Sequence, residues 1–262
     1  MAHFGEMTQI ITRETPIQVV ILCGGRGERL GGLTLERPKP MIEIGGKPIL
    51  WHIMQHFARH GFTDFTLALG YQGWVVDWYF KDPESTDGWT VHCVPTGWET
   101  QSGGRIKRLA SQITGTFLMS WCDGVSDIDL TAMLALHRSH GKLCTMAAVK
   151  APERFGTMEM SFHGGLYSPG GAAFAQVTSF QEKQQSEQWI NGGFFVCEPG
   201  VLDYIAGDTT QWEREPMEKI AKDGELMAFA HQGFWQCMDT EKEQRMLDDL
   251  CRRGQAPWVK QW

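Results

Sequence analysis

Long hydrophobic runs are missing from this sequence. No stretch of its 262 residues approaches the ~18 apolar residues of a membrane-spanning helix, and residues 1–16 are mixed and polar, without a secretion signal's apolar segment. Paired cysteines are missing too, because the seven are odd in number, form no Cys-x-x-Cys motif and mostly lie in apolar runs (23, 93, 122, 144, 197, 237 and 251). These absences exclude a disulfide framework and a zinc knuckle, and they predict a soluble, cytoplasmic protein with reduced thiols.

An excess of positive charge is also absent. The chain has 24 Lys and Arg against 31 Asp and Glu, a formal net charge of −7, and its basic residues are scattered. We therefore expect no nucleic-acid partner and no membrane partner, although a small local anion site is compatible with this balance. No linker and no internal repeat interrupts the sequence, so we expect a single domain.

The common phosphate-binding motifs are missing as well. A dinucleotide fingerprint that begins at Gly25 needs a small residue at position 30, where the chain has leucine. A Walker loop needs Ser or Thr after its Gly-Lys, but Gly46-Lys47 is followed by proline.

A glycine-rich loop is present in another form. Residues 19–22 are apolar, as in a strand buried on both faces, and the chain then changes to glycine and arginine: Gly24, Gly25, Gly27, Arg26 and Arg29. Glycine lets backbone N–H groups approach a ligand, and arginine suits phosphate oxygens. The pattern favours a phosphate-binding loop, and an ordinary structural turn is the alternative.

Lys39 lies between Pro38 and Pro40. Each proline fixes its own φ and restricts the residue before it, so the lysine ammonium is presented from a stiff loop. This favours a functional role for Lys39 over a chance placement.

Strands and helices alternate through the first half of the chain. We expect strands near 19–22, 65–69, 89–94, 116–122 and 144–149, with helices between them. In the second half the shorter segments 158–162, 173–180 and 193–196 are joined by glycine-rich turns. The pattern predicts an α/β fold, a Rossmann-like, mostly parallel mixed sheet flanked by helices, with a smaller β-rich part in the second half.

One aspartate is a candidate metal ligand, and a second lies at the start of an expected helix. Asp123 directly follows the apolar strand 116–122, and ligands of open α/β sheets collect beyond the carboxyl ends of strands, so it is placed for Mg²⁺. A plain Asp-Gly turn is the alternative. Asp239 precedes a capping box formed by Thr240 and Glu243, so it could simply favour the start of the following helix.

Three stretches, Gly-Gly-x-Gly-x-Arg-Leu, Arg-Pro-Lys-Pro-Met and Gly-Gly-Lys-Pro-Ile-Leu, together resemble the N-terminal signature of the sugar-phosphate nucleotidyltransferases. The wording from Lys39 to Met54 is most similar to the glucose-1-phosphate cytidylyltransferases. The likeness extends over residues 17–258 and includes the loop 102–105, where Ser102 replaces the threonine of Thr-Gly-Gly-Arg. Its order along the chain is more specific than any single motif.

The resemblance implies a division of the chain into a tail (1–16), a nucleotide-binding half (17–150) and a sugar-phosphate-binding half (151–262). It implies catalytic roles for Arg29, Lys39 and Asp123. It places these residues around the nucleotide: Leu22, Gly24, Gly25, Arg26, Gly27, Glu28, Arg29, Lys39, Thr100, Gly104, Arg105 and Asp123. It places Glu182, Lys183, Asn191 and Gly192 around the sugar phosphate, and Mg²⁺ on Asp123 and Asp239.

The activity implied is transfer of a cytidylyl group from CTP to a sugar 1-phosphate, glucose 1-phosphate first, by in-line attack at the α-phosphorus with release of pyrophosphate. UTP or dTTP, another sugar 1-phosphate, or a regulatory module that binds nucleotide without turnover are the alternatives. Two departures bear on these expectations. The region 81–97 is shorter than the corresponding family region, which contributes to subunit contacts, so whether the chain forms a homo-oligomer stays open. Glu182-Lys183 is followed by glutamine, where the family has proline.

Overall fold

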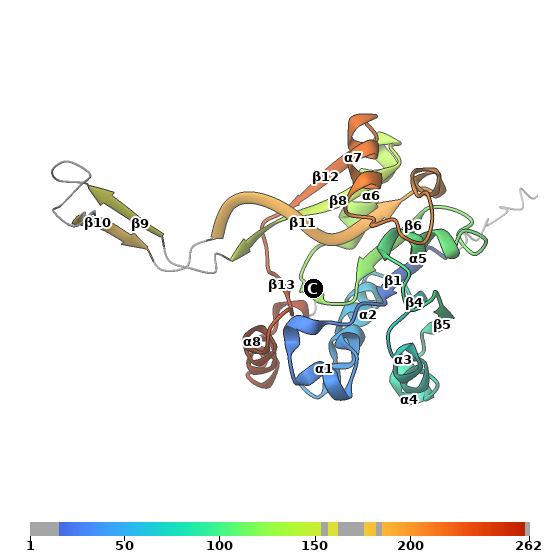
Figure 1. Cartoon of the computed structure of the whole chain (residues 1–262), viewed down its shortest axis with the longest axis horizontal. Helices are drawn as coiled ribbons and strands as arrows, with labels where there is room; N and C mark the ends of the chain where they lie inside the picture. Colours follow the sequence, from blue (N-terminus) through green and yellow to red (C-terminus); the bar gives the residue numbers. More distant parts are fainter. Residues whose placement is uncertain (1–15, 153–156, 162–175, 182–184, 260–262) are drawn as a thin grey trace, which may run out of the picture.

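A seven-stranded sheet forms the centre of the part of the chain that the computed structural model describes, residues 16–152, 157–161, 176–181 and 185–259 (Figure 1). The strand order across this sheet is β12-β8-β11-β6-β1-β4-β5. In chain order its strands are β1 (Gln18–Cys23), β4 (Asp64–Leu69), β5 (Thr90–Pro95), β6 (Phe117–Trp121), β8 (Cys144–Pro152), β11 (Gln185–Cys197) and β12 (Leu226–His231).

The sheet is mostly parallel. β1 pairs in parallel with β4 and β6, β4 with β5, and β8 with β12, whereas β11 runs antiparallel between β6 and β8. The predicted α/β class is confirmed. The second half differs in detail from the expectation, because β11 and β12 extend the central sheet instead of forming a separate layer. From this shared sheet we infer that both halves belong to one domain.

The helices cover both faces of the sheet. Longer helices are α2 (Ile49–Arg59), α3 (Gly73–Phe80), α5 (Ser102–Arg108), α6 (Leu130–His140), α7 (Glu215–Lys222) and α8 (Glu241–Arg252). Shorter ones are α1 (Leu33–Glu36), α4 (Pro83–Thr86) and the 3₁₀ turns η1 (Glu28–Leu30), η2 (Lys39–Met41), η3 (Pro199–Tyr204) and η4 (Pro257–Val259). None of the helices in the described ranges has the length and apolar character needed to cross a lipid bilayer.

β1 shows why the core has two sides. Val19 and Ile21 pack in the cluster that includes residues of α2, α3, α6 and α8, while Val20 and Leu22 pack in the cluster that includes residues of α5 and α7. Successive side chains of a strand point to opposite faces, so a strand covered on both faces is apolar throughout.

Three small antiparallel pairs complete the described structure: β2 (Glu43–Ile44) with β3 (Lys47–Pro48), β7 (Gly124–Ser126) with β13 (Trp235–Cys237), and β9 (Thr157–Ser161) with β10 (Gln176–Gln181). β9 and β10 overlap two of the predicted strand segments, 158–162 and 173–180, and each extends one residue beyond its segment. The remaining positions of those segments, 162 and 173–175, lie outside the described residues.

α2 buries histidines together with its apolar side. The Nε2 atom of His52 is 2.8 Å from the carbonyl oxygen of Ile44, whereas Nε2 of His56 is buried without a hydrogen-bond partner. Burial lowers the pKa of His56 to about 3, with a smaller contribution from His60. His56 is therefore a neutral base at physiological pH.

Candidate active site

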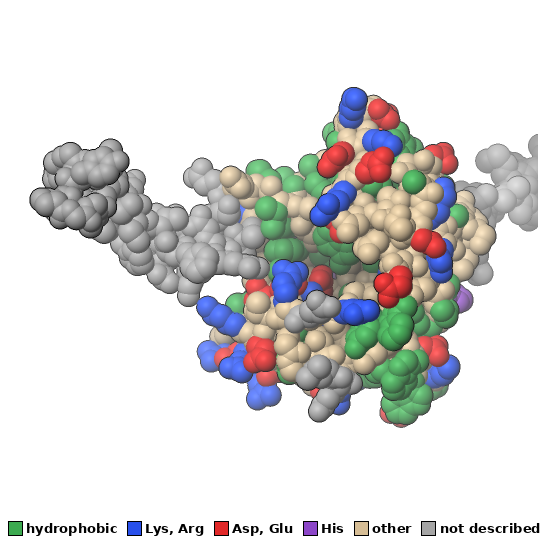
Figure 2. Space-filling model, in the orientation of Figure 1, with side chains coloured by type: hydrophobic (Ala, Val, Ile, Leu, Met, Phe, Trp, Pro, Cys, Tyr) green, Lys and Arg blue, Asp and Glu red, His purple; other side chains and the backbone are tan. Residues whose placement is uncertain are grey.

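Two adjoining cavities lie at the carboxyl ends of β1 and β6, where the space-filling view shows a hollow (Figure 2). The larger, about 600 Å³, is lined by the glycine-rich loop after β1 and by residues 98–102, and the smaller, about 340 Å³, by residues 191–193 and the end of β13. Both are lined by Arg29, Trp121, Asp123, Glu213 and Asp239. Two ligands bound side by side would meet at these shared residues.

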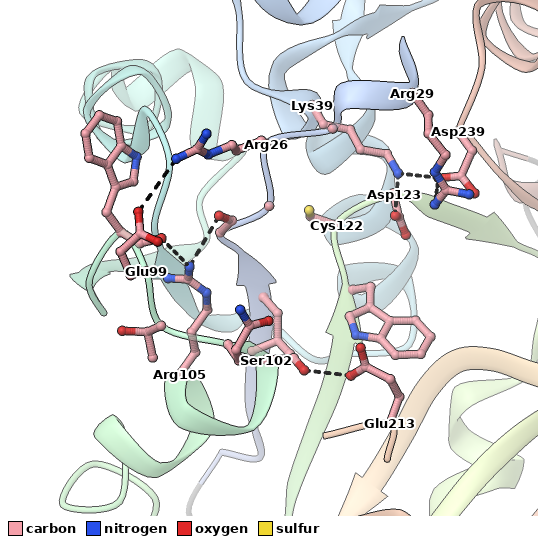
Figure 3. Close-up of a pocket in the computed structure, with 18 residues that line it drawn as sticks. Arg26, Arg29, Lys39, Glu99, Ser102, Arg105, Cys122, Asp123, Glu213 and Asp239 are labelled. Carbon is pink, nitrogen blue, oxygen red and sulfur yellow. Dashed lines mark hydrogen bonds and ion pairs between the residues drawn. The ribbon is translucent and has the colours of Figure 1, made fainter. Parts of the chain in front are cut away.

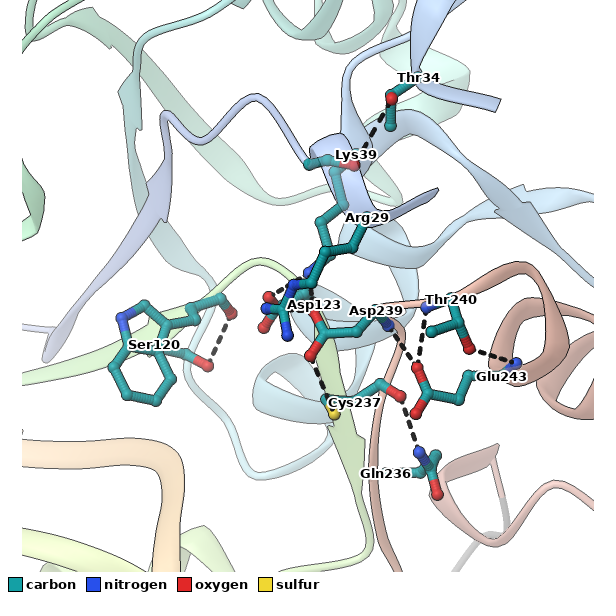
Figure 4. A network of polar contacts seen from close by, with 12 residues as sticks. Arg29, Thr34, Lys39, Ser120, Asp123, Gln236, Cys237, Asp239, Thr240 and Glu243 are labelled. Carbon is teal, nitrogen blue, oxygen red and sulfur yellow. Dashed lines mark hydrogen bonds and ion pairs between the residues drawn. The ribbon is translucent and has the colours of Figure 1, made fainter. Parts of the chain in front are cut away.

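Lys39 lines the larger cavity and contacts two of the residues that both cavities share. Its Nζ atom is 2.6 Å from Oδ2 of Asp123 and 2.7 Å from Oδ1 of Asp239, so it donates to both carboxylates (Figure 3). Arg29 Nη2 donates to the same Oδ1 of Asp239 at 3.0 Å (Figure 4). All three predicted catalytic residues, with the second predicted metal ligand, are thus brought to one point.

Local structure explains how these side chains meet. Asp123 directly follows β6, and the backbone N–H of Met238 donates to its carbonyl oxygen at 2.8 Å, which ties the chain before Asp239 to it. Thr240 and Glu243 form the predicted capping box of α8, and the Glu243 carboxylate also accepts the N–H of Asp239 at 2.7 Å. Lys39 begins the turn η2 after an extended Pro38. The backbone of each of the three residues is therefore fixed.

The Lys39 side chain is largely buried, so its two ion pairs are sheltered from water. Burial alone would lower the pKa of Lys39, but the two carboxylates outweigh it and hold the pKa above its ordinary value. Burial would raise the pKa of Asp239, but Lys39 and then Arg29 hold it below its ordinary value. Lys39 and Asp239 are therefore both charged at neutral pH.

The glycine-rich loop leaves space on the cavity side. A Cβ atom added to Gly25 would meet no atom within 4 Å, and Gly27 has a φ of +67°, which favours glycine. Arg26 extends from this loop and its Nη2 is 3.6 Å from Oε1 of Glu99. Leu22 and Thr100 also line the cavity. Glu28 belongs to η1, and its side chain is outside the described residues.

Arg105 is buried at the opposite end of the larger cavity. Its guanidinium donates to the carbonyl oxygens of Leu69, Gly97, Gly24 and Trp98, at 2.7–3.5 Å, and to the hydroxyl of Thr96 at 2.8 Å. It therefore joins the ends of three strands to the loop that follows β5. Arg105 lines the cavity, and its predicted contact with a base stays a prediction.

Gly104 lies against protein instead of the cavity. Its N–H donates to the carbonyl oxygen of Thr210 at 3.2 Å, and a Cβ atom there would be 2.5 Å from the carbonyl oxygen of Asp208. The glycine thus allows α5 to pack closely on residues 207–214. A nucleotide contact for Gly104 stays a prediction.

The predicted sugar-phosphate residues are described only in part. Asn191 and Gly192 line the smaller cavity. The Oδ1 atom of Asn191 accepts the N–H of Gly193 at 2.9 Å, and Trp235 Nε1 donates to the carbonyl of Gly192 at 2.7 Å. Glu182 and Lys183 lie outside the described residues.

Sequence reasoning missed Glu213. It lines both cavities, and its Oε2 accepts the hydroxyl of Ser102 at 2.6 Å; that hydroxyl in turn accepts the N–H of Trp212 at 2.9 Å. Glu213 lies between η3 and α7 in a segment without a glycine motif or a strand end. No local pattern marks it, because only its contact with α5 brings it to the site.

The carboxylates fit a divalent cation. No cluster of three or more His, Cys, Asp or Glu suited to a metal occurs in the described part of the chain, so the protein offers two carboxylates here. Mg²⁺ is commonly held by one or two carboxylates together with substrate phosphates and water. Asp123 and Asp239 converge on one cationic atom beside the larger cavity, which meets that requirement.

Comparison with known proteins shows what this chain is similar to. The family model described as nucleotidyl transferase matches residues 18–240. Glucose-1-phosphate cytidylyltransferase of Salmonella typhi is 41% identical, with 94% of this chain and 100% of the relative covered, and the probable glucose-1-phosphate cytidylyltransferase of Bacillus subtilis is 36% identical with the same coverage. The structure of HddC from Yersinia pseudotuberculosis, complexed with GMP-PN, has a TM-score of 0.66 at 21% identity, covering 89% of this chain and 98% of that one. The last likeness concerns the fold alone.

Proposed function

Because the chain belongs to the nucleotidyl transferase family, we propose that it transfers a cytidylyl group from CTP to glucose 1-phosphate, giving CDP-glucose and pyrophosphate. The observation that carries this proposal is the convergence of Lys39, Arg29, Asp123 and Asp239 on the wall shared by the two cavities. The 41% identity to a glucose-1-phosphate cytidylyltransferase over 94% of the chain supports the choice of both substrates.

The larger cavity takes the nucleotide and the smaller takes the sugar phosphate. The glycine-rich loop turns backbone N–H groups and Arg26 toward the triphosphate, while Asn191 and Gly192 face the sugar. The α-phosphorus and the attacking 1-phosphate oxygen then meet beside Lys39 and Arg29. Holding both reactants in line accounts for much of the catalysis in such a reaction.

Charged side chains provide the remaining part of the catalysis. Lys39 and Arg29 stabilise the negative charge that develops on the transferred phosphoryl group, and such a preorganised group is worth about a hundredfold or more in rate. Asp123 and Asp239 would hold Mg²⁺, which when bound neutralises phosphate charge. No covalent intermediate is required. The reaction as proposed needs no oxidant and no second cofactor.

The base preference follows from hydrogen-bonding groups. Cytosine offers an acceptor at N3 and an amino donor at the 4-position, and uracil offers the reverse. A site that pairs one set leaves buried groups unpaired with the other, at about 1–3 kcal/mol for each group. We expect kcat/KM for CTP to exceed that for UTP at least about tenfold, which corresponds to ~1.4 kcal/mol.

Release of pyrophosphate from CTP, UTP and dTTP, each with Mg²⁺ and glucose 1-phosphate, tests the proposal. The expected result is rapid release with CTP. Equal or faster release with UTP would overturn the cytidylyl assignment and leave nucleotidyl transfer in place. Binding of CTP without release of pyrophosphate, whichever sugar 1-phosphate is supplied, would instead identify a regulatory module. We propose a cytoplasmic setting for the reaction, since all seven cysteines are free.

A further inference from the structure

The ammonium of Lys39 lies where a metal ion would bind. Its two hydrogen bonds end on Oδ2 of Asp123 and Oδ1 of Asp239, at 2.6 and 2.7 Å, and both aspartates line the larger cavity. The other oxygen of Asp239, Oδ2, is 3.7 Å from the Cys237 sulfur. A cation bound by both carboxylates would therefore use the oxygen atoms that Lys39 already occupies (Figure 4).

We propose that Lys39 and a divalent cation compete for the Asp123–Asp239 carboxylate pair, so that the metal binds tightly only once a triphosphate draws Lys39 away. The inference rests on the proposed function and adds an order of binding to it. Lys39 thus has two partners in turn, the carboxylates before the nucleotide binds and the phosphates afterwards.

The charge balance supports this competition. Two carboxylates face two cations, Lys39 and Arg29, so the cluster is close to neutral. The Lys39 side chain is only 10% exposed, which leaves little water to screen it. A divalent cation would have to enter against both positive groups, whereas a triphosphate brings enough negative charge to accept both side chains and the metal together.

The lysine is also able to change partners. Its stem packs against the glycine-rich loop, because a Cβ atom on Gly27 would be 2.9 Å from Cβ of Lys39. The Lys39 side chain therefore runs along this loop at least as far as its Cδ atom, which would be 3.4 Å from that Cβ. Lysine is a point charge on a flexible four-carbon stem, so its head can move to a phosphate while the backbone of η2 stays in place.

Binding of Mn²⁺ to the nucleotide-free protein, followed by the loss of the free-ion paramagnetic resonance signal, tests the competition without any turnover. Lys39→Met keeps the stem and removes the charge, and we expect it to bind Mn²⁺ at least tenfold more tightly than the wild type. Adding Asp123→Asn to this variant should abolish the gain. Lys81→Met is the matched control, because it breaks a lysine–carboxylate pair with Asp77 away from the shared wall, and its Mn²⁺ affinity should equal that of the wild type.

A folded Lys39→Met protein with wild-type Mn²⁺ affinity would overturn the proposal. If that variant does not fold, Arg29→Met decides the matter: its side chain is 71% exposed, so the fold should tolerate the change, and we expect a smaller but measurable gain in Mn²⁺ affinity. No gain there would likewise contradict the competition. The Mn²⁺ titration keeps its meaning even if pyrophosphate release fails with every nucleotide, so the failures of the two proposals are distinguishable.

Discussion

The two ends of the larger cavity each hold a buried cation, and their partners differ in kind. Lys39 is bound by two carboxylates, whereas Arg105 is bound by backbone carbonyl oxygens and one hydroxyl. Carboxylates raise the pKa of Lys39, while burial lowers the pKa of Arg105 below its ordinary value. The partners of Lys39 are side chains that other cations can also use, but those of Arg105 are the backbone itself.

This difference in partners indicates different roles for the two cations, one in the reaction and one in the stability of the fold. A cation held by carboxylates can replace these partners by charged groups of an incoming ligand. A guanidinium held by carbonyls fixes the loops around the cavity, and its removal leaves buried acceptors without a donor. Changes at the Lys39 end should therefore alter activity, and changes at the Arg105 end should alter stability.

The largest expected effect is at the Lys39 end. Asp123→Asn should lower kcat by about 10²–10³-fold, as is typical for loss of one preorganised charged group, because a neutral amide holds a divalent cation poorly. Lys39 keeps Asp239 as a partner, so unfolding in urea should change little. Pyrophosphate release at limiting Mg²⁺ is the measurement. Asp249→Asn, in an exposed pair with Arg253, is the control, and near-normal activity of Asp123→Asn would refute the metal assignment.

Arg105→Met tests the other end. Loss of the guanidinium leaves carbonyl oxygens such as that of Gly97 without this donor, and we expect the free energy of unfolding to fall by about 3 kcal/mol. The urea midpoint measures this change. Arg108→Met is a matched control on the same helix, because Arg108 pairs with Asp208 at the surface, and it should have a much smaller effect. Wild-type stability of Arg105→Met would show that its carbonyl contacts are not structural.

Two glycines test the same contrast between effects on stability and effects on activity. Gly104→Ala should reduce stability by about 2 kcal/mol, because its Cβ would be 2.5 Å from the backbone of Asp208 and overpacking of this kind is costly. Gly25→Ala meets no protein atom within 4 Å, so stability should be unchanged while KM for CTP rises. Urea unfolding and steady-state kinetics on both variants separate the two cases. A destabilised Gly25→Ala protein would assign that glycine to packing.

The smallest effect concerns a buried base that has no counter-charge at all. The pKa of His56 is lowered to about 3, so between pH 6.5 and pH 3 the unfolded chain binds a proton that the folded chain does not. Stability therefore falls as the pH drops through this window, by about 1.4 kcal/mol per pH unit. His56→Gln should reduce the stability difference between pH 7.5 and pH 5.5 by about that amount for one unit, measured by urea unfolding. An unchanged pH dependence would mean that folding does not lower the pKa of His56.

Much of the Lys39 end of the larger cavity was predictable from the sequence. The apolar run before Gly24, the position of Asp123 after a strand and the capping box after Asp239 are local signals. The rule that ligands collect beyond the carboxyl ends of strands predicts the place of Asp123. It does not apply to Asp239, because β13 pairs antiparallel with β7 outside the central sheet, and only the family resemblance linked the two aspartates. The structure brings Asp123 and Asp239 to the same Lys39 atom.

The rest depends on tertiary contacts that no local pattern contains. Glu213 reaches the site only because residues 207–214 pack on α5, and the same packing explains Gly104. The partners of Arg105 depend on which strand ends surround it. The insertion of β11 between β6 and β8 was also not foreseen, because hydrophobic periodicity identifies a strand but carries no information about its neighbours.

The position of β11 has a consequence for how the chain folds during synthesis. β6 and β8 are both made well before β11, yet neither pairs with the other, since β11 lies between them. Until the ribosome has released residues 185–197, each of these strands has an open edge, and such edges are sites of aggregation. A fragment that stops at residue 150 would retain those open edges. Residues 17–150 are therefore not expected to fold alone, and a truncation at residue 150 should yield insoluble protein.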